Sequence, residues 1–203
     1  MKKLDYNSPV VLTYAIAAAL ALALNRLTGG WTNAHLFSVY RCSPLDPLAC
    51  IRLFGHAIGH SGWSHYAGNF MMILLLGPAL EEKYGGKRLL LFMLATAAVT
   101  GLVHMLVSPA GLLGASGIVF MMIVLSSCAG LREGRVPITL LLILAIYLGE
   151  QVVTGFTVHD HISQLGHIVG GVCGAVFGLT FSERRGGYGG ESRENRWLRT
   201  GKL

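Results

Sequence analysis

The sequence predicts an all-helical membrane protein built as a bundle of six transmembrane helices. Of its 203 residues, 53% are hydrophobic and only 13% are charged, a balance that soluble domains rarely show. The apolar residues also fall into separate runs whose lengths approach the roughly 20 residues that a helix needs to cross a bilayer. The runs are Val10–Leu27, Tyr66–Leu80, Leu89–Val107, Ser116–Leu131, Ile138–Thr154 and Gln164–Phe181.

The first apolar run follows Lys2 and Lys3, as the apolar region of a signal peptide would. No convincing cleavage site of small residues comes after it, and Asn25 and Arg26 interrupt its end. We therefore expect the run to be retained as the first span.

The positions of lysine and arginine predict the orientation in the membrane, because cytoplasmic segments carry an excess of both. One alternate set of segments holds most of them, and the opposite set holds only Arg26, Arg41 and Arg52. We expect the protein to lie in a bacterial inner (plasma) membrane with both termini in the cytoplasm. Attraction to anionic lipid at the cytoplasmic surface then explains the net charge of +6. Nucleic acid is not expected as a partner. The cationic residues of the cytoplasmic set are Lys2, Lys3, Lys83, Lys87, Arg88, Arg132, Arg135, Arg184, Arg185, Arg193, Arg196, Arg199 and Lys202.

The chain reads as one membrane domain, 1–182, followed by a basic tail, 183–203, that we expect to be disordered in the cytoplasm. Its first external loop, about 28–64, is long and half apolar. Trp31 and Trp63 in this loop are typical of a segment partly sunk into the outer leaflet.

Three polar clusters interrupt the predicted spans. His65 and Asn69 lie at the start of the second span, Ser116 at the start of the fourth and His167 near the start of the sixth. Strongly polar side chains inside a membrane are costly, so the default interpretation is functional. The alternating topology brings all three clusters to the same outer side, which indicates one shared site.

The sixth span places glycine at every fourth position around His167, at 166, 170, 174 and 178. Such a stripe of small residues lets a neighbouring helix approach closely. Helix packing alone explains the stripe, with His167 as a hydrogen-bonding strut. The same close approach is also what a serine hydroxyl needs to come within about 3 Å of an imidazole.

Ser116 has two interpretations, a helix N-cap or a nucleophile. Gly114 and Gly117 leave room beside it for a substrate backbone, and a helix N-terminus directs free N–H groups at an oxyanion. His65 and Asn69 are four residues apart on one helix face and could donate hydrogen bonds to the same oxyanion. A polar contact between helices would explain these two residues equally well.

Two other protease classes are excluded by what the sequence lacks. A membrane aspartyl protease needs two aspartates in its spans, yet Asp5, Asp46 and Asp160 all fall outside them. No histidine is followed by glutamate, so the zinc motif H-E-x-x-H is absent. No acid lies near His167 in the sequence, and the nearest, Asp160, is in a predicted loop. We therefore expect a Ser–His dyad, without cofactor or metal, in which neutral histidine accepts the serine proton.

Four motifs in order along the chain resemble those of the rhomboid family of intramembrane serine proteases. They are "GHAIGHSGWSHYAGNF", which ends in H-x-x-x-N, then "GPALEEKYGGKRLL", "GASG" and "GHIVGGVCG". The resemblance covers nearly the whole chain, from about Val10 to Phe181. It implies a six-helix bundle that cleaves transmembrane helices near small, helix-destabilising residues.

The resemblance also implies residue roles. Ser116 would be the nucleophile and His167 the general base and then acid, while His65, Asn69 and the Ser116 N–H would form the oxyanion hole. His60 would support the first loop, and Glu81 would fix the turn after the second span. Further substrate or structural support is expected from Gly114, Gly117, Phe120, Gly170 and Gly174.

Two positions depart from the family pattern. Ile51-Arg52 stands where many members have Trp-Arg in the first loop, which affects the packing of that loop. Phe120 stands where many members have a tyrosine that stacks on the catalytic histidine. Phenylalanine keeps the stacking and loses the hydroxyl.

Two other functions compete with an active protease. A catalytically inactive rhomboid-like protein would bind membrane proteins without cutting them, although such relatives usually lack the serine or the histidine. A metal-handling protein would use histidines, but no acidic or cysteine partner has suitable spacing. Its candidate ligands are His56, His60, His65, His159 and His161. The substrate, the oligomeric state and any Cys42–Cys50 disulfide are left open.

Overall fold

A computed structural model describes residues 6–43, 46–131 and 161–181, with isolated positions between 138 and 149. In this part of the chain every regular element is a helix, and the only β-pairing is an isolated bridge between Val39 and Leu112. The predicted all-helical class is therefore confirmed. The helices are α1 (Pro9–Leu27), α2 (Trp31–His35), α3 (Ala49–Gly55), α4 (Trp63–Tyr84), α5 (Gly86–Val107), α6 (Ser116–Leu131) and α8 (His161–Thr180).

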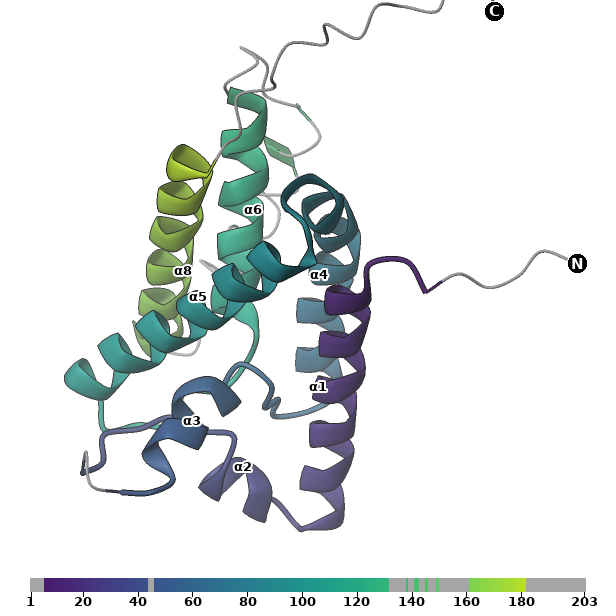
Figure 1. Ribbon diagram of the computed structural model, residues 1–203. Helices are drawn as coiled ribbons and strands as arrows, with labels where there is room; N and C mark the ends of the chain where they lie inside the picture. Colours follow the sequence, from purple (N-terminus) through teal and green to yellow (C-terminus); the bar gives the residue numbers. More distant parts are fainter. Residues whose placement is uncertain are drawn as a thin grey trace, which may run out of the picture.

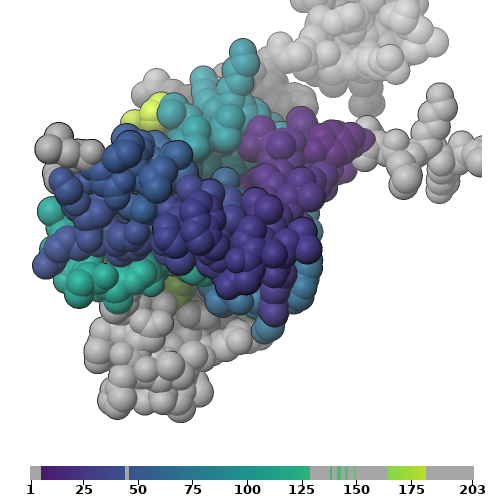
Figure 2. Space-filling view, turned by 90° about the horizontal axis from the view of Figure 1, so that it is seen from below, coloured from purple at the N-terminus to yellow at the C-terminus, as the bar shows by residue number. Residues whose placement is uncertain are grey.

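The long helices form two neighbouring pairs, α1 with α4 and α6 with α8, and α5 runs obliquely across them (Figure 1). The short helices α2 and α3 lie at the end of the bundle where α1 ends. Seen from that end, the segment that carries them covers much of the surface beside α1 (Figure 2). The first residues of α4, α6 and α8 lie toward this same end (Figure 1).

The helix boundaries agree with the predicted runs, with one correction. The turn predicted after the second span is reduced to a single residue, because α4 continues to Tyr84 and α5 begins at Gly86. Only Gly85 separates the two helices, and its φ of 81° is a backbone conformation that glycine adopts freely. The predicted span Ile138–Thr154 lies outside the described residues apart from isolated helical positions, as does the tail 183–203.

Two described helices, α1 and α5, are long and apolar enough to cross a membrane. Shorter apolar stretches, Ser116–Cys128 and Gln164–Thr180, lie within α6 and α8. The count of six spans therefore stays a prediction.

The distribution of polar and apolar side chains is that of a protein surrounded by hydrocarbon. Leu20, Leu75 and Leu106 are 65%, 58% and 76% exposed on the outside of α1, α4 and α5. Polar side chains such as Asn69 and Thr96 are buried between the helices instead. An apolar exterior of this extent on a soluble monomer would mark an interaction surface.

Glu81 has a structural role that the sequence did not predict. Its carboxylate accepts hydrogen bonds from the backbone N–H groups of Val10 and Val11, both at 3.0 Å. An anion at this position satisfies donors that have no partner within the first turn of α1 and complements the helix dipole. The buried Glu81 therefore caps α1 from α4, and its backbone carbonyl oxygen also accepts the N–H of Gly85 at 2.9 Å in the turn that follows α4.

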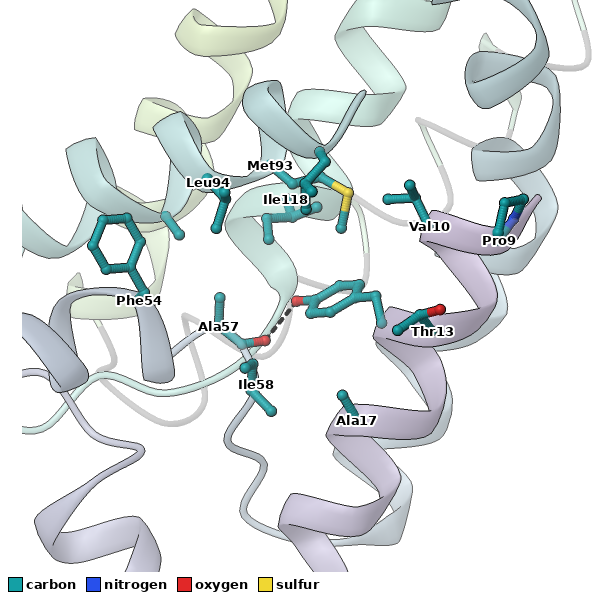
Figure 3. A pocket seen from close by; sticks show the side chains of 13 residues that line it. Pro9, Val10, Thr13, Ala17, Phe54, Ala57, Ile58, Met93, Leu94 and Ile118 are labelled. Atoms are coloured by element: carbon teal, nitrogen blue, oxygen red, sulfur yellow. Dashed lines mark hydrogen bonds between the residues drawn. The ribbon is translucent and has the colours of Figure 1, made fainter. Parts of the chain in front are cut away.

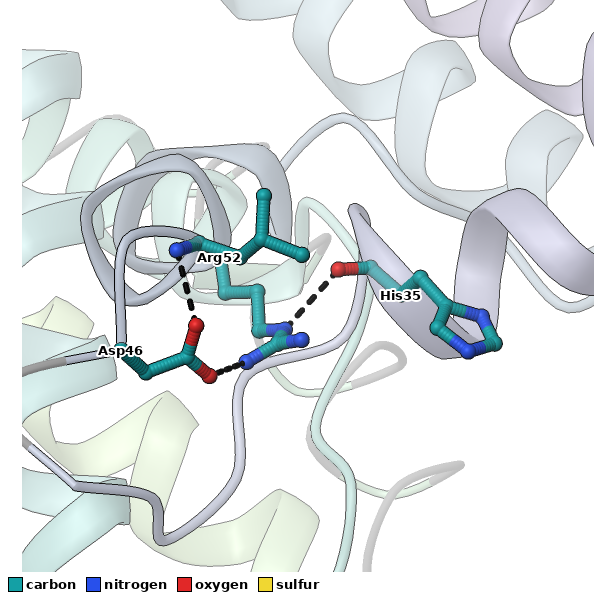
Figure 4. A network of polar contacts seen from close by, with 4 residues as sticks. His35, Asp46 and Arg52 are labelled. Carbon is teal, nitrogen blue, oxygen red and sulfur yellow. Dashed lines mark hydrogen bonds and ion pairs between the residues drawn. The ribbon is translucent and has the colours of Figure 1, made fainter.

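Arg52 holds the first loop together from α3 (Figure 4). Its guanidinium donates to the His35 carbonyl oxygen at 2.9 Å, pairs with the Asp46 carboxylate and lies over the Tyr40 ring. The Leu48 N–H and this guanidinium keep the pKa of Asp46 below its usual value. The loop around Ile51 is therefore anchored by its arginine, while Ile51 is exposed.

Candidate active site

Ser116 is the first residue of α6, and the segment before it is fastened to its neighbours by backbone hydrogen bonds. Leu112 exchanges two bonds of 2.9 Å with Val39 in the isolated bridge. The Gly114 N–H donates to the His56 carbonyl oxygen at 2.8 Å, and the His104 ring donates to the Ala110 carbonyl oxygen at 2.7 Å. The approach to Ser116 is thus held by the first loop and by α5.

Helix α8 lies directly against the first turns of α6. A Cβ atom built on Gly170 would lie 2.1 Å from the Gly117 carbonyl oxygen, and one on Gly174 would lie 2.4 Å from the Met121 carbonyl oxygen. Real Cβ contacts are essentially never shorter than 3.0 Å. The two backbones therefore touch at a distance that only glycine permits, as the four-residue glycine spacing predicted.

His167 lies beside the turn of α6 that follows Ser116. Its ring stacks on Phe120 with a centroid separation of 4.4 Å and an interplanar angle of 14°. Only 6% of His167 is exposed, and Ser116 is partly exposed. Phe120 is four residues after Ser116, so the stacked ring holds the imidazole one helical turn from the serine. The stacking expected for Phe120 is present.

His65 and Asn69 of α4 converge on Gly114, two residues before Ser116. A Cβ built on Gly114 would lie 2.7 Å from Nε2 of His65 and 3.8 Å from Nδ2 of Asn69. The Asn69 amide also donates to the His65 carbonyl oxygen at 3.1 Å. Two side-chain nitrogens from α4 therefore face the backbone at the start of α6, across a space that glycine leaves empty.

Ser61 is a site residue that the sequence analysis missed. Its hydroxyl oxygen lies 3.1 Å from Nδ1 of His65, on the opposite side of the ring from Nε2. If the hydroxyl donates, Nδ1 is the acceptor and the ring proton of neutral His65 resides on Nε2, which faces Gly114. The sign of this contact in the sequence is the position of Ser61 four residues before His65.

His60 and His56 hold the loop behind the site through hydrogen bonds to its backbone. Each Nδ1–H donates to a nearby carbonyl oxygen, of Ile58 at 2.9 Å and of Leu53 at 3.0 Å. Burial lowers the pKa of both histidines to about 4, so both are neutral at pH 7. The His60 carbonyl oxygen accepts a bond of 2.9 Å from the Asn33 amide.

A small cavity lies between Ser116 and the neighbouring helices. It reaches from Gly114 and Gly117 to Gly166 on α8 and to Thr100 on α5. The cavity therefore marks the point where α5, α6 and α8 meet beside the serine.

Glu81 is remote from this cavity. It lies at the other end of α4, roughly 24 Å from His65 at 1.5 Å per residue.

Metal ligands do not gather in the described part of the chain. No three histidine, cysteine, aspartate or glutamate side chains come together there in a group that could hold a metal ion. Of the five histidines considered as ligands, His159 lies outside the described residues. Cys42 and Cys50 are free thiols that line one cavity.

A helical bundle with an apolar exterior, and with serine, histidine and amide groups gathered between its helices, defines a class. This class is the integral membrane proteins with a polar site inside the helix bundle. The family model described as Rhomboid domain matches residues 47–184, more than half of the chain. The chain therefore belongs to the rhomboid family, a family of intramembrane proteases.

One curated relative is Rhomboid protease GluP of Bacillus subtilis (strain 168). It is 29% identical over 181 residues, an alignment that covers 84% of this chain and 34% of the relative. The chain thus spans about a third of the length of that relative. The resemblance identified from the four motifs is confirmed at the level of the family.

Proposed function

We propose that this chain is an active intramembrane serine endopeptidase with Ser116 as nucleophile and His167 as general base. One observation carries the proposal, the meeting of three helices at the start of α6. The His167 ring stacks on Phe120 there, and Nε2 of His65 faces Gly114. A nucleophile, a base and oxyanion donors are the three parts that acyl transfer requires.

In the first half of the reaction, Ser116 Oγ attacks the carbonyl carbon of the scissile peptide bond and its proton passes to His167. The carbonyl oxygen becomes an oxyanion, which accepts hydrogen bonds from Nε2–H of His65, from the Asn69 amide and from the Ser116 N–H. The positive end of the α6 dipole adds to this stabilisation. Collapse of the intermediate breaks the C–N bond, and His167 gives the proton to the leaving amine.

In the second half, water replaces the amine. His167 takes a proton from the water as the water oxygen attacks the ester carbon of the acyl-enzyme. The same donors bind the second oxyanion, and the ester bond breaks with return of the proton to Ser116 Oγ. The products are a carboxylic acid and the free enzyme, so no cofactor or metal ion is needed.

The proposed substrates are transmembrane helices cut near small, helix-destabilising residues. A carbonyl within a regular helix is hydrogen-bonded and shielded by side chains, so the helix must open before Ser116 can attack. Gly114 and Gly117 flank the serine without side chains, which favours an extended segment with small residues against the site. The lipid bilayer is the medium in which both partners meet.

The proposed topology has six spans in the domain 1–182, both termini in the cytoplasm of a bacterial cell and a site that opens to the outer side of the inner membrane. Its support is the lysine and arginine asymmetry along the sequence. The starts of α4, α6 and α8 at one end of the bundle agree with this topology (Figure 1). Accessibility of single cysteines introduced near each terminus, in sealed inverted vesicles, tests the orientation.

The test of the proposed function is cleavage of a single-span substrate by purified protein in detergent. Wild type is expected to cut the substrate and to react with a fluorophosphonate probe, while Ser116→Ala and His167→Ala retain the fold and lose cleavage. Cleavage by Ser116→Ala at the wild-type rate would overturn the mechanism. Folded wild-type protein that binds substrate without cleavage or probe labelling would indicate the catalytically inactive binder instead.

Removing the Ser61 hydroxyl is expected to slow cleavage without a matching change in KM. In Ser61→Ala, the His65 tautomer that carries its proton on Nε2 loses one stabilising hydrogen bond. The free energy of one such hydrogen bond corresponds to about a five- to tenfold fall in kcat. Ser61→Thr keeps a hydroxyl and should restore most of the rate. Ser64→Ala, an exposed serine on the first turn of α4, is the matched control, and an equal loss in both alanine variants would contradict the role of Ser61.

A further inference from the structure

An apolar groove lies between α1, α3 and α5 (Figure 3). Its volume is about 380 Å³. Val10, Thr13 and Ala17 line it from successive turns of α1, and the exposed side chains of Phe54 and Leu94 lie opposite. The groove is therefore open to the outside of the bundle along about two turns of α1.

The polar atoms in the groove already have partners. The Tyr14 hydroxyl donates to the Ala57 carbonyl oxygen at 2.6 Å, the bond drawn at Ala57 in Figure 3. The Thr13 hydroxyl is bonded to that of Tyr6 at 3.0 Å. A groove whose hydroxyls are satisfied by the protein offers nothing to a polar ligand, so its complement is hydrocarbon.

One end of the groove continues into a second hollow, which has charged residues in its lining, where α1 and α5 begin. The two share Pro9, Val10 and Leu90. The hollow is lined by Lys87 and Glu82, both exposed, and neither forms an ion pair within the described part of the chain. The neighbouring Glu81 carboxylate already accepts the two N–H groups of α1.

We propose that this groove holds one phospholipid with a zwitterionic headgroup. The phosphate pairs with Lys87, the headgroup cation pairs with Glu82, and one acyl chain lies along α1 toward α3. A positive and a negative side chain beside an apolar groove complement the headgroup and acyl chain of such a lipid. Because the chain belongs to a family of membrane proteins, phospholipid surrounds it. From Val10 to Ala17 the helix advances roughly 10 Å, room for a large part of an acyl chain within one leaflet.

The bound chain would lie close to the candidate active site. Ala57, Ala97 and Ile118 line both the groove and the small cavity beside Ser116. A single layer of side chains thus separates the two spaces. The lipid would therefore support the backbone that carries Ala57 and, next to it, His56, whose carbonyl oxygen holds Gly114.

Lipid retention, independent of cleavage, tests the proposal. The full chain is purified from nanodiscs of phosphatidylethanolamine and phosphatidylglycerol, and bound lipid is counted by native mass spectrometry. Wild type should retain one phosphatidylethanolamine, and Ala17→Trp, which fills the groove, should lower retention about tenfold or more. Ala19→Trp places the same side chain on a face of α1 outside the groove and should match wild type.

Charge variants test the headgroup. Lys87→Ala should weaken retention of both lipids, whereas Glu82→Gln should weaken only phosphatidylethanolamine, and Lys83→Ala, outside the hollow, should change neither. Preferred retention of phosphatidylglycerol, insensitive to Glu82→Gln, would overturn the zwitterionic occupant. Equal retention by the Ala17→Trp and Ala19→Trp proteins, or a dimer cross-linked through the groove, would overturn the site itself.

Discussion

Gly170→Ala is expected to force α8 away from α6, to lower the melting temperature sharply and to abolish cleavage. The added methyl carbon would lie 2.1 Å from the Gly117 carbonyl oxygen and 3.0 Å from the Gly117 Cα, both backbone atoms that no rotamer change can move aside. Overpacking a well-packed site lowers the free energy of unfolding by about 1–3 kcal/mol when side chains can adjust. Because the clash here is with backbone atoms, we expect a loss at the upper end of that range or above it.

The loss of activity follows from where the clash falls. Gly117 is bonded directly to Ser116, so any displacement of α8 from Gly117 also moves the imidazole of His167 relative to the serine hydroxyl. A misplacement of about 1 Å between reacting groups costs on the order of 10²-fold in rate. The cleavage assay should therefore detect Gly170→Ala even in protein that remains folded.

Gly171→Ala is the matched control for this prediction. It adds the same atom to the same helix one residue later, where the nearest neighbour is Val124 Cγ2 at an ordinary 3.7 Å. Its melting temperature and cleavage rate should stay near those of wild type. If Gly170→Ala behaved like Gly171→Ala in both measurements, the close contact between α6 and α8 would be wrong.

Local patterns in the sequence were enough to predict much of this arrangement. The predicted run Ser116–Leu131 coincides with α6, and α1 begins one residue before its predicted run. The four-residue glycine period predicted the contact face of α8, because a helix places such residues in one line. The stacking of Phe120 on His167 came from the family pattern.

Contacts between segments far apart in the chain could not be predicted in the same way. Glu81 caps α1 across about 70 residues of sequence, and only the antiparallel packing of α1 and α4 brings them together. The bridge between Val39 and Leu112 likewise joins the first loop to the approach of α6. A sequence shows that Glu81 has a charge to satisfy; it does not show which helix end will satisfy it.

Gly114→Ala is expected to lower kcat by about 10²–10³-fold or more while leaving Ser116 and His167 in place, since removal of one oxyanion donor alone typically has that effect. The new methyl carbon would lie 2.7 Å from Nε2 of His65, in the space that the two α4 nitrogens face. It would also impose a side chain on a residue with φ of 128°, a conformation that costs about 1–3 kcal/mol.

Gly111→Ala is the control for Gly114→Ala, because it lies in the same segment and its added carbon would meet only the Ser38 side chain, at 3.6 Å. The two causes of a loss in Gly114→Ala differ in their signature. Strain lowers the melting temperature and acts on the whole segment, whereas a blocked oxyanion site lowers kcat with little change in KM, since the donors act on the transition state. Gly114→Ala with wild-type kcat would mean that His65 and Asn69 do not bind the oxyanion, and both would then be polar contacts that hold α4 against the start of α6.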